Sequence, residues 1–274
     1  MKPNTIELGD LTVHRLGFGA MRVLGPDVWG APQDRKAAHA VFRRAVELGV
    51  NFFDSADAYG PNTDEELIAE ALHPYPKGFV IGTKGGCIRP NRRWDADGRP
   101  EHLRGAVEGS LKRLKLERID LYQLHTVDPK VKIEDSVGAL ADLQRAGKIR
   151  HLGLSNVTVK QLEQARRIAP IVSVQNRYNL GDRKSEDVLE HCEKLGIAFL
   201  PWYPLGAGNS LDLSKVKKLS EKKKASPAQV VIAWLLARSP VMLPIPGTGS
   251  VAHLEENVAA AELKLGPADL EVLE

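Results

Sequence analysis

The chain has 274 residues, of which 43% are hydrophobic and 27% charged, and its 38 basic and 35 acidic side chains give a formal net charge of +3. This composition is ordinary for a soluble globular protein and excludes a disordered or fibrous chain. The near balance of charge argues against nucleic acid or a membrane surface as the natural partner. The length fits either two small domains or one large α/β barrel.

The cysteines and the apolar runs indicate where the protein works. Cys87 and Cys192 form neither a CxxC pair nor a metal-ligand spacing, so we expect reduced thiols and no metal site. The N-terminal MKPNTIELGD has no apolar signal core, and the longest apolar run, Val230 to Ala237, is far shorter than a membrane span. We therefore expect a cytoplasmic protein. The basic run from Lys215 to Lys224 is interpreted as a solvated helix face.

The first elements are a hairpin and a glycine-rich strand. Thr5 to Val13 alternates apolar and polar residues around Gly9-Asp10, which is a hairpin pattern. Leu16 to Met21, with the sequence LGFGAM, is predicted to be a short strand that suits close approach of a ligand to the backbone. A loop rich in Gly and Pro follows and contains Trp29.

From Asp34 onward, helices and short apolar strands alternate along the chain. Asp34 is predicted to cap a helix that Gly49 ends, and Thr63 with Glu66 has the capping-box spacing of a second helix. A later helix is expected to begin near Val251. The other expected helices are Pro100–Leu114, Ile133–Ala146, Thr158–Ile168, Arg183–Leu195, Pro227–Arg238 and Pro267–Leu273.

Eight short strands are expected between these helices. Alternation of such strands with helices of ten or more residues predicts a parallel sheet covered by helices, and eight units favour a closed (β/α)8 barrel. An open doubly wound sheet is the alternative, but no GxGxxG turn follows the first strand. The expected strands are Leu16–Met21, Val50–Asp54, Phe79–Thr83, Ile119–Leu124, Ile149–Leu154, Ile171–Val174, Ala198–Trp202 and Val241–Ile245.

Polar residues follow the predicted strands, and in a barrel they would share the rim where barrel enzymes have their active sites. Asp54 and Tyr59 follow the second strand, Lys84 ends the third and His125 ends the fourth. Each residue alone has an ordinary interpretation as a loop or surface residue. Their joint position at one end of successive strands indicates a functional site. Strands five to seven end in Ser155, Asn156, Gln175 and Trp202.

At this point the sequence resembles the aldo-keto reductases over nearly its whole length. The resemblance implies a (β/α)8 TIM barrel whose bottom is closed by an N-terminal β-hairpin, forming one domain over residues 1–274. The matching motifs, in chain order, are LGFGAM at Leu16, NFFDSADAYG at Asn51, GTKGG at Gly82, DLYQLH at Asp120, GKIRHLGLSN at Gly147, VQNRYN at Val174, PWYPLGAG at Pro201 and LPIPGTGSVAHLEEN at Leu243.

The resemblance implies that the protein reduces aldehydes or ketones to alcohols by hydride transfer, with a catalytic tetrad of Asp54, Tyr59, Lys84 and His125. Tyr59 would hydrogen-bond the carbonyl oxygen and then donate a proton to it. A free Tyr has a pKa near 10, and Lys84, kept charged by Asp54, would lower that pKa. His125 would be a second donor that orients the carbonyl.

The hydride donor implied by the resemblance is a nicotinamide cofactor bound without the dinucleotide fingerprint. Trp202 would stack on the nicotinamide ring, while Ser155, Asn156 and Gln175 would hydrogen-bond its carboxamide. Further contacts with the nicotinamide and pyrophosphate are implied at Gly19, Ala20, Met21, Asp54, Tyr203, Pro204, Leu205 and Gly206. The adenosine end is assigned to Gly247, Thr248, Ser250, His253, Glu256 and Asn257.

A 2′-phosphate would fit the helix N-terminus near Val251, because such a terminus favours anions. The sequence departs from the family here, since an Arg common at the position of His253 and a Lys common at Gly247 are absent. NADPH is the expected cofactor, with NADH as the alternative.

For the substrate, we expect a small carbonyl compound. Trp29 and Trp94, with Tyr59, His125 and Trp202, would form an aromatic pocket suited to an aldehyde on a flat or apolar group. The segments LGPDVWGAPQDR and IPGTGSVAHLEEN are similar to bacterial pyridoxal reductases of the family. Many relatives continue beyond the position of Glu274 into a loop over the pocket, so an open site with broad aldehyde acceptance is expected.

Two other functions compete with this hypothesis. An NADP(H)-binding redox-sensing subunit with little turnover would need no intact tetrad, and no long partner-binding extension precedes Thr5. A metal-dependent barrel hydrolase or isomerase would need a set of metal ligands, which Asp54 and His125 alone do not provide. A monomer or a weak homo-oligomer is expected.

Overall fold

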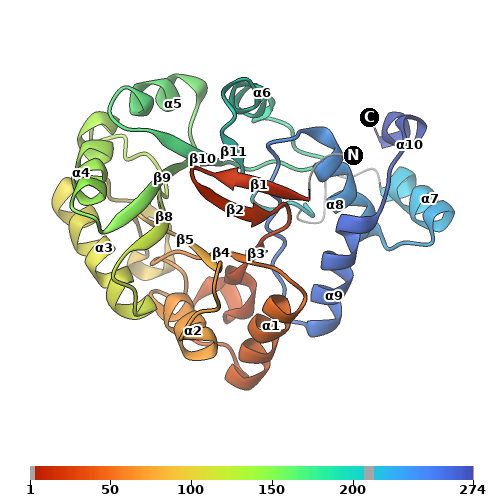
Figure 1. The fold of residues 1–274 in the computed structure, drawn as a ribbon, viewed down its shortest axis with the longest axis horizontal. Helices are drawn as coiled ribbons and strands as arrows, with labels where there is room; N and C mark the ends of the chain where they lie inside the picture. Colours follow the sequence, from red (N-terminus) through yellow and green to blue (C-terminus); the bar gives the residue numbers. More distant parts are fainter. Residues whose placement is uncertain (1–3, 207–212, 274) are drawn as a thin grey trace.

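The computed structural model describes residues 4–206 and 213–273. At its centre is a seven-stranded sheet in the order β11-β10-β9-β8-β5-β4-β3, and all neighbouring strands are parallel. Figure 1 shows these strands surrounded by helices. The strands are β3 (Phe18–Gly19), β4 (Phe52–Asp54), β5 (Val80–Gly85), β8 (Ile119–Leu124), β9 (Ile149–Ser155), β10 (Ile171–Gln175) and β11 (Ala198–Phe199).

Helices surround the sheet, and several of them bury one apolar face, whereas α8 buries the six consecutive residues Val230 to Leu235. In α1, for example, Ala38, Val41, Phe42 and Ala45 are buried at helical spacing. The α-helices are α1 (Arg35–Glu47), α2 (Thr63–Leu72), α3 (Pro100–Leu114), α4 (Ile133–Arg145), α5 (Val159–Arg166), α6 (Glu186–Leu195), α7 (Leu213–Lys223), α8 (Pro227–Arg238), α9 (Val251–Ala259) and α10 (Pro267–Leu273). Short 3-10 helices are η1 (Ala20–Val23), η2 (Pro26–Val28), η3 (Pro90–Arg92) and η4 (Ala260–Glu262).

The two edges of the sheet are joined through residues 241–245. Phe199 of β11 donates to the Val241 carbonyl and accepts from Leu243, both at 2.8 Å. On the other side, Gly17 donates to the Pro244 carbonyl at 2.9 Å. The prediction of an eighth strand at residues 241–245 is wrong, because this segment forms only an isolated bridge, between Phe199 and Met242. Pro244 and Pro246 have no N–H donors, which prevents a regular ladder.

The predicted N-terminal hairpin forms from β1 (Thr5–Leu8) and β2 (Leu11–His14), with Gly9 at a φ of +67° in its turn. Leu8 and Val13 are buried in one cluster with apolar residues of the central strands. His14 donates to the Asn51 side chain at 2.9 Å, directly before β4. The hairpin therefore lies against the amino ends of the strands and leaves their carboxyl ends free.

Of the two helix caps discussed in the sequence analysis, one is confirmed and one is wrong, and one small hairpin was not predicted. The Asp34 cap is confirmed, since its side chain accepts from Ala37 N at 3.0 Å. The capping box at Thr63 is wrong: α2 begins at Thr63 itself, Asn62 precedes it with a φ of +72°, and the Thr63 hydroxyl donates to the Gly60 carbonyl at 2.7 Å. No pattern in the sequence indicated the small hairpin between β6 (Cys87–Ile88) and β7 (Asp95–Ala96).

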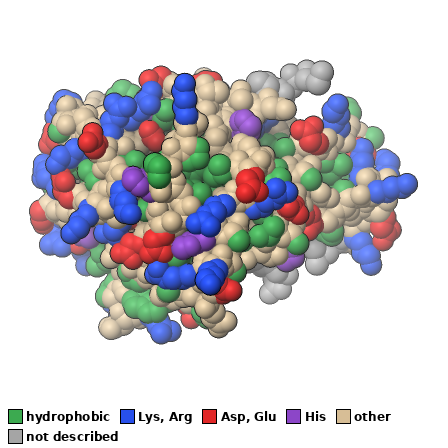
Figure 2. All heavy atoms as spheres, turned by 60° about the horizontal axis from the view of Figure 1, so that its bottom comes forward, with side chains coloured by type: hydrophobic (Ala, Val, Ile, Leu, Met, Phe, Trp, Pro, Cys, Tyr) green, Lys and Arg blue, Asp and Glu red, His purple; other side chains and the backbone are tan. Residues whose placement is uncertain are grey.

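The surface agrees with the near balance of charge. On the face shown in Figure 2, basic and acidic side chains are interspersed. The lysine-rich run forms α7, as predicted, with Val216 and Leu219 buried and Lys217 and Lys218 exposed. Within residues 4–206 and 213–273, no helix combines the length and apolar character needed to cross a membrane. Glu274, on which the expectation of an open pocket rested, lies outside the described residues.

Candidate active site

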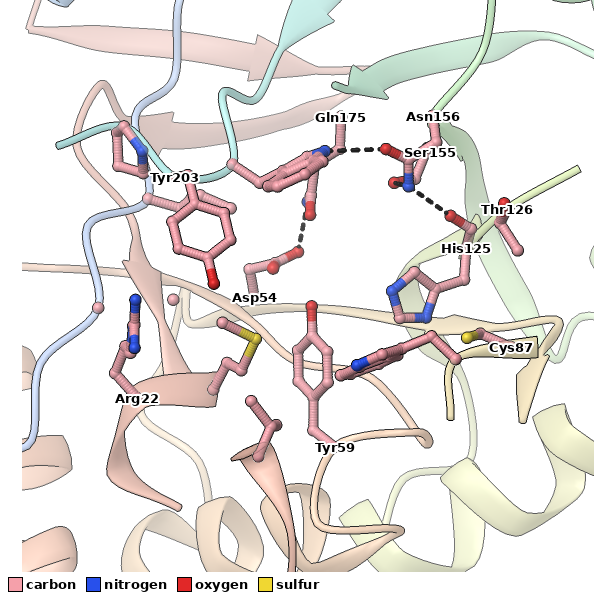
Figure 3. A pocket seen from close by; sticks show the side chains of 18 of the residues that line it. Arg22, Asp54, Tyr59, Cys87, His125, Thr126, Ser155, Asn156, Gln175 and Tyr203 are labelled. Atoms are coloured by element: carbon pink, nitrogen blue, oxygen red, sulfur yellow. Dashed lines mark hydrogen bonds between the residues drawn. The ribbon is translucent and has the colours of Figure 1, made fainter. Parts of the chain in front are cut away.

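A cavity of about 920 Å³ lies at the carboxyl ends of the strands. Asp54 at the end of β4, Ser155 at the end of β9 and Gln175 at the end of β10 all line it. Tyr59 and His125 line it from the loops after β4 and β8. The predicted common rim is therefore present, and Figure 3 shows these side chains directed into one space.

Lys84 joins the tetrad from behind the cavity wall. Its Nζ donates to Asp54 Oδ2 at 2.7 Å, to the Ser55 carbonyl at 2.8 Å and to the Tyr59 hydroxyl at 3.3 Å. The Lys84 side chain is fully buried. His125 completes the group, with its ring centroid 5.6 Å from that of Tyr59. The structure thus brings all four predicted residues together.

The charge states of Lys84 and Tyr59 follow from their surroundings. Burial alone would lower the pKa of Lys84, but the carboxylate of Asp54 and the phenol of Tyr59 outweigh it, so the pKa is raised and Lys84 stays charged. Burial raises the pKa of Tyr59 to about 12, although Lys84 acts to lower it. Lys84 therefore acts on the pKa of Tyr59 in the direction expected from the sequence, but burial has the larger effect and the net shift is upward.

His125 is held neutral. Burial, together with the neighbouring Lys84 ammonium, keeps the pKa of His125 well below 6.5. Its Nδ1 is buried and has no hydrogen-bond partner among the described residues. A neutral imidazole has one N–H donor and one acceptor nitrogen, so it can donate a hydrogen bond to a carbonyl oxygen without carrying charge.

Asp54 also binds two amides, one of which the sequence analysis missed. Gln175 Nε2 donates to Asp54 Oδ1 at 2.8 Å, and Gln123 Nε2 donates to the same oxygen at 3.2 Å. Gln123 is fully buried on β8. The period-2 alternation of Leu121, Gln123 and His125 along this strand was a signal that Gln123 faces the interior.

A second polar group lies across the cavity from Tyr59, and Figure 3 shows its hydrogen bonds. Asn156 adopts a φ of +57°, and its Nδ2 donates to the His125 carbonyl and to Ser155 Oγ, both at 3.1 Å. Its Oδ1 accepts from Trp202 Nε1 at 2.9 Å. Trp202 is half-buried and lines the cavity, so it is a wall of the site and not a core residue.

Two glycines allow close approach of backbone segments at the cavity edge. A Cβ on Gly247 would lie 2.2 Å from the Gly19 carbonyl oxygen, and one on Gly19 would lie 2.7 Å from the Ile245 carbonyl oxygen. Neither position has room for a side chain. The other predicted residues that line this side are Met21, Tyr203, Pro204, Leu205 and Gly206, whereas Ala20 is buried and does not line the cavity.

Of the residues assigned to the adenosine end, Gly247 lines the cavity, and the others lie outside its wall, on α9 or directly before it, namely Thr248, Ser250, His253, Glu256 and Asn257. Ser250 caps this helix by accepting from His253 N at 3.4 Å, and its own N–H donates to Thr248 Oγ1 at 3.1 Å. His253 is exposed, Glu256 is half-buried and Asn257 is buried. A helix N-terminus with an exposed His253 is thus open to an anionic group.

The two predicted substrate-pocket tryptophans differ in position. Trp94 lines the cavity, is 47% exposed, and has its ring 6.2 Å from those of both Tyr59 and His125. Trp29 does not line it, and Asp27 and Val28 form the wall there instead. The cavity wall also contains residues that the sequence analysis did not assign to the site, namely Arg22, Cys87, Arg89, Arg92, Thr126, Ile245 and Pro246.

The donor set fits a nicotinamide dinucleotide. An aromatic wall at Trp202 lies next to side-chain amides, and two closely spaced glycines lead to a helix N-terminus. Among the described residues, no group of three or more His, Cys, Asp and Glu side chains is arranged to hold a metal ion.

A curled parallel sheet covered by helices, with a cavity lined partly by polar side chains at the carboxyl ends of its strands, is typical of α/β-barrel-like enzymes. The family model for the "Aldo/keto reductase family" matches residues 15–274. The chain belongs to this family and is an oxidoreductase.

Similar proteins support the assignment along the whole chain. An uncharacterized oxidoreductase of Schizosaccharomyces pombe is 49% identical over 264 residues, which cover 95% of this chain and 86% of the relative. Pyridoxine 4-dehydrogenase of Escherichia coli is 42% identical over 281 residues, covering 100% and 98%. The predicted resemblance to pyridoxal reductases is thereby confirmed. An aldo-keto reductase of Klebsiella pneumoniae, solved in complex with NADPH, is 25% identical with a TM-score of 0.84, covering 100% of this chain and 94% of that one.

Proposed function

We propose that this protein reduces aldehydes to alcohols with NADPH, and that Tyr59 is the general acid. The observation that supports this best is the position of the Lys84 ammonium, which hydrogen-bonds Asp54 at 2.7 Å and the Tyr59 hydroxyl at 3.3 Å beside the cavity. A buried cation in contact with a phenol favours the phenolate that proton donation would leave.

The roles of the four residues follow from the charge that develops in the reaction. The cofactor supplies the hydride, so negative charge appears on the carbonyl oxygen of the substrate. Tyr59 hydrogen-bonds that oxygen and transfers its proton to it. Lys84 stabilises the resulting phenolate, and Asp54 keeps Lys84 charged and in place. His125, held neutral, donates a second hydrogen bond to the same oxygen.

The cofactor is assigned to the wall of the cavity that contains Trp202. In the proposal, Trp202 stacks on the nicotinamide, and Ser155, Asn156 and Gln175 hydrogen-bond its carboxamide. The backbone of residues 203–206 would hold the pyrophosphate, and residues at the start of α9 would hold the adenosine end. The complex of the Klebsiella relative with NADPH supports NADPH over NADH. NADH is the alternative because neither Gly247 nor His253 has a permanent cation.

For the substrate we propose an aldehyde on a flat ring, with pyridoxal as the first candidate. The relative that is 42% identical is named pyridoxine 4-dehydrogenase. The exposed face of Trp94 beside Tyr59 and His125 offers an aromatic surface for such a ring. We also propose that residues 1–274 form one (β/α)8 barrel domain whose bottom is closed by the β1–β2 hairpin. The cytoplasmic location and the monomeric or weakly oligomeric state remain predictions.

NADPH oxidation with pyridoxal and with benzaldehyde tests the proposal. Tyr59→Phe should lose roughly 10³-fold in kcat, because a positioned general acid contributes about 10²–10⁴-fold. It should bind NADPH as the wild type does. Tyr75→Phe is the matched control, since the Tyr75 hydroxyl donates to the Leu114 carbonyl at 2.7 Å away from the cavity. Equal activity of Tyr59→Phe and wild type would refute the mechanism, whereas tight NADPH binding without turnover of any carbonyl would favour the redox-sensing subunit.

A further inference from the structure

Arg89 is a buried arginine in the wall of the cavity. It follows β6, is 7% exposed, and lines the cavity. Its Nη1 donates to the Val28 carbonyl at 3.2 Å, and its Nη2 donates to the carbonyls of Asp27 and Arg92, both at 3.1 Å. One guanidinium therefore joins the loop before α1 to the loop after β6.

The three carbonyls belong to residues with unfavourable backbone conformations. Asp27, Val28 and Arg92 have φ angles of 58°, 57° and 65°. Left-handed backbone is rare for residues other than glycine and is a genuine outlier for a β-branched residue such as Val28. Such strain persists only where surrounding contacts determine the conformation, and it is common at ligand sites. Arg89 provides those contacts for both turns at once.

The same guanidinium packs on two tryptophans. Its Cζ lies 3.7 Å from the ring centroid of Trp94 and 5.5 Å from that of Trp29. Among the described residues no carboxylate forms an ion pair with Arg89, and its buried Nε has no hydrogen-bond partner. The guanidinium is thus held by carbonyl oxygens and aromatic faces, an environment that a charge serving only surface solubility does not require.

Arg89 is connected to Tyr59 through two of its own partners, Val28 and Trp94. The Val28 carbonyl accepts a second hydrogen bond, at 3.2 Å, from the N–H of Gly60, the residue after Tyr59. Trp94 in turn packs edge-on against Tyr59 and His125. The position of the Trp94 ring relative to the reacting groups therefore depends on the Arg89 side chain.

We propose that Arg89 is a positioning residue that fixes Trp94 as a stacking wall beside Tyr59 and His125, and so determines a preference for aldehydes on flat aromatic rings. This inference rests on the proposed carbonyl reductase activity. Lysine could not replace Arg89, because an ammonium lacks the planar fork that reaches three carbonyls and stacks on an indole.

The test compares two aldehydes with each variant. For wild type, Arg89→Met and Arg89→Lys, kcat/KM is measured with benzaldehyde and with propanal, and the ratio is the readout. Arg89→Met should lower the ratio about tenfold through the benzaldehyde KM, and Arg89→Lys should restore little of it. Arg93→Met is the matched control, because Arg93 is in the same loop but is 66% exposed and paired with Asp95. An unchanged ratio in Arg89→Met would overturn the proposal.

A second readout does not depend on turnover. Acrylamide quenching of tryptophan fluorescence is measured for each protein and for the same protein carrying Trp94→Phe. The difference between the two gives the quenching of Trp94. Arg89→Met should increase quenching of Trp94, whereas Arg93→Met should leave it unchanged. If the wild type reduces neither aldehyde, the proposed function fails, and this quenching decides the positioning role alone. Unchanged quenching of Trp94 would show that Arg89 does not hold it.

Discussion

The Lys84 ammonium donates a 2.7 Å hydrogen bond to Asp54 in the interior of the barrel, where the Lys84 side chain is fully buried and that of Asp54 is 3% exposed. Removing one partner of a buried ion pair leaves the other charge unpaired and out of water, which is far more costly than losing an exposed pair. The two residues therefore depend on one another for stability as well as for chemistry.

The first prediction concerns this pair. Asp54→Asn, which keeps the shape of the side chain but removes its charge, should lower the free energy of unfolding by about 3–5 kcal/mol, because Lys84 then lacks its partner. Turnover with NADPH should fall as well. Urea unfolding measures the first effect. Glu70→Gln is the control, since Glu70 pairs with Arg35 at 2.7 Å on the surface and its loss should change stability by less than about 1 kcal/mol. Equal effects of the two substitutions would contradict the prediction.

The second prediction is a pH dependence that arises from Asp57. Burial, with a smaller contribution from nearby Glu65, raises the pKa of Asp57 from 3.8 to about 8. Between these values the folded protein holds a proton that the unfolded chain releases, so stability from this group falls as the pH rises through that window. Asp57→Asn should remove this dependence.

Urea unfolding near pH 5 and near pH 8 measures the effect. The stability gained by Asp57→Asn over wild type should be larger at the higher pH. Asp142→Asn is the control, because Asp142 is an exposed carboxylate that pairs with Arg104. A gain for Asp57→Asn that does not increase between the two pH values would argue against a protonated Asp57 in the folded state.

The third prediction tests the contact between Gly19 and Gly247. Gly247→Ala should lower the free energy of unfolding by about 1–3 kcal/mol, because its Cβ would lie 2.2 Å from the Gly19 carbonyl oxygen. NADPH affinity should fall too. Gly138→Ala is the control: Gly138 lies inside α4, and a methyl group there would have nothing within 4 Å, so alanine should stabilise the helix by about 1 kcal/mol. Thermal unfolding that ranks the two variants in the opposite order would refute the contact.

The fourth prediction concerns the choice of cofactor. His253→Arg places a permanent cation in the first turn of α9, where the 2′-phosphate is assigned. It should raise the ratio of kcat/KM for NADPH to that for NADH by about tenfold, the effect of one charge-assisted hydrogen bond. Ala252→Arg, at the neighbouring exposed residue, is the control. A gain that is equal for both cofactors would place the 2′-phosphate elsewhere.

Most of the fold and the four central site residues were predictable from the sequence. Parallel strands place their carboxyl ends on one edge, so Asp54, Lys84 and His125 had to meet once the alternation of strands and helices was recognised. The prediction of a strand at residues 241–245 was wrong because prolines interrupt the hydrogen-bond ladder, although the apolar pattern of a strand is intact.

The remaining features depend on contacts that leave no mark on the sequence. Arg89 donates to backbone carbonyls, which every residue possesses, so no pattern of side chains in the sequence indicates its role. The upward shift in the pKa of Tyr59 arises from burial by the whole barrel and exceeds the local effect of Lys84. Neither property can be inferred from spacing alone.

The closure of the sheet through Gly17 and Pro244 has a consequence for how the chain folds. More than 200 residues separate Gly17 from Pro244 in the sequence, so the ring of strands stays open on a ribosome until residues 241–245 have emerged. Until then β3 and β11 are unpaired edges, which can pair with other chains. Contacts of such long sequence separation also slow folding. Nascent chains of this protein should therefore depend on chaperones up to that point, and protease resistance should appear only after it.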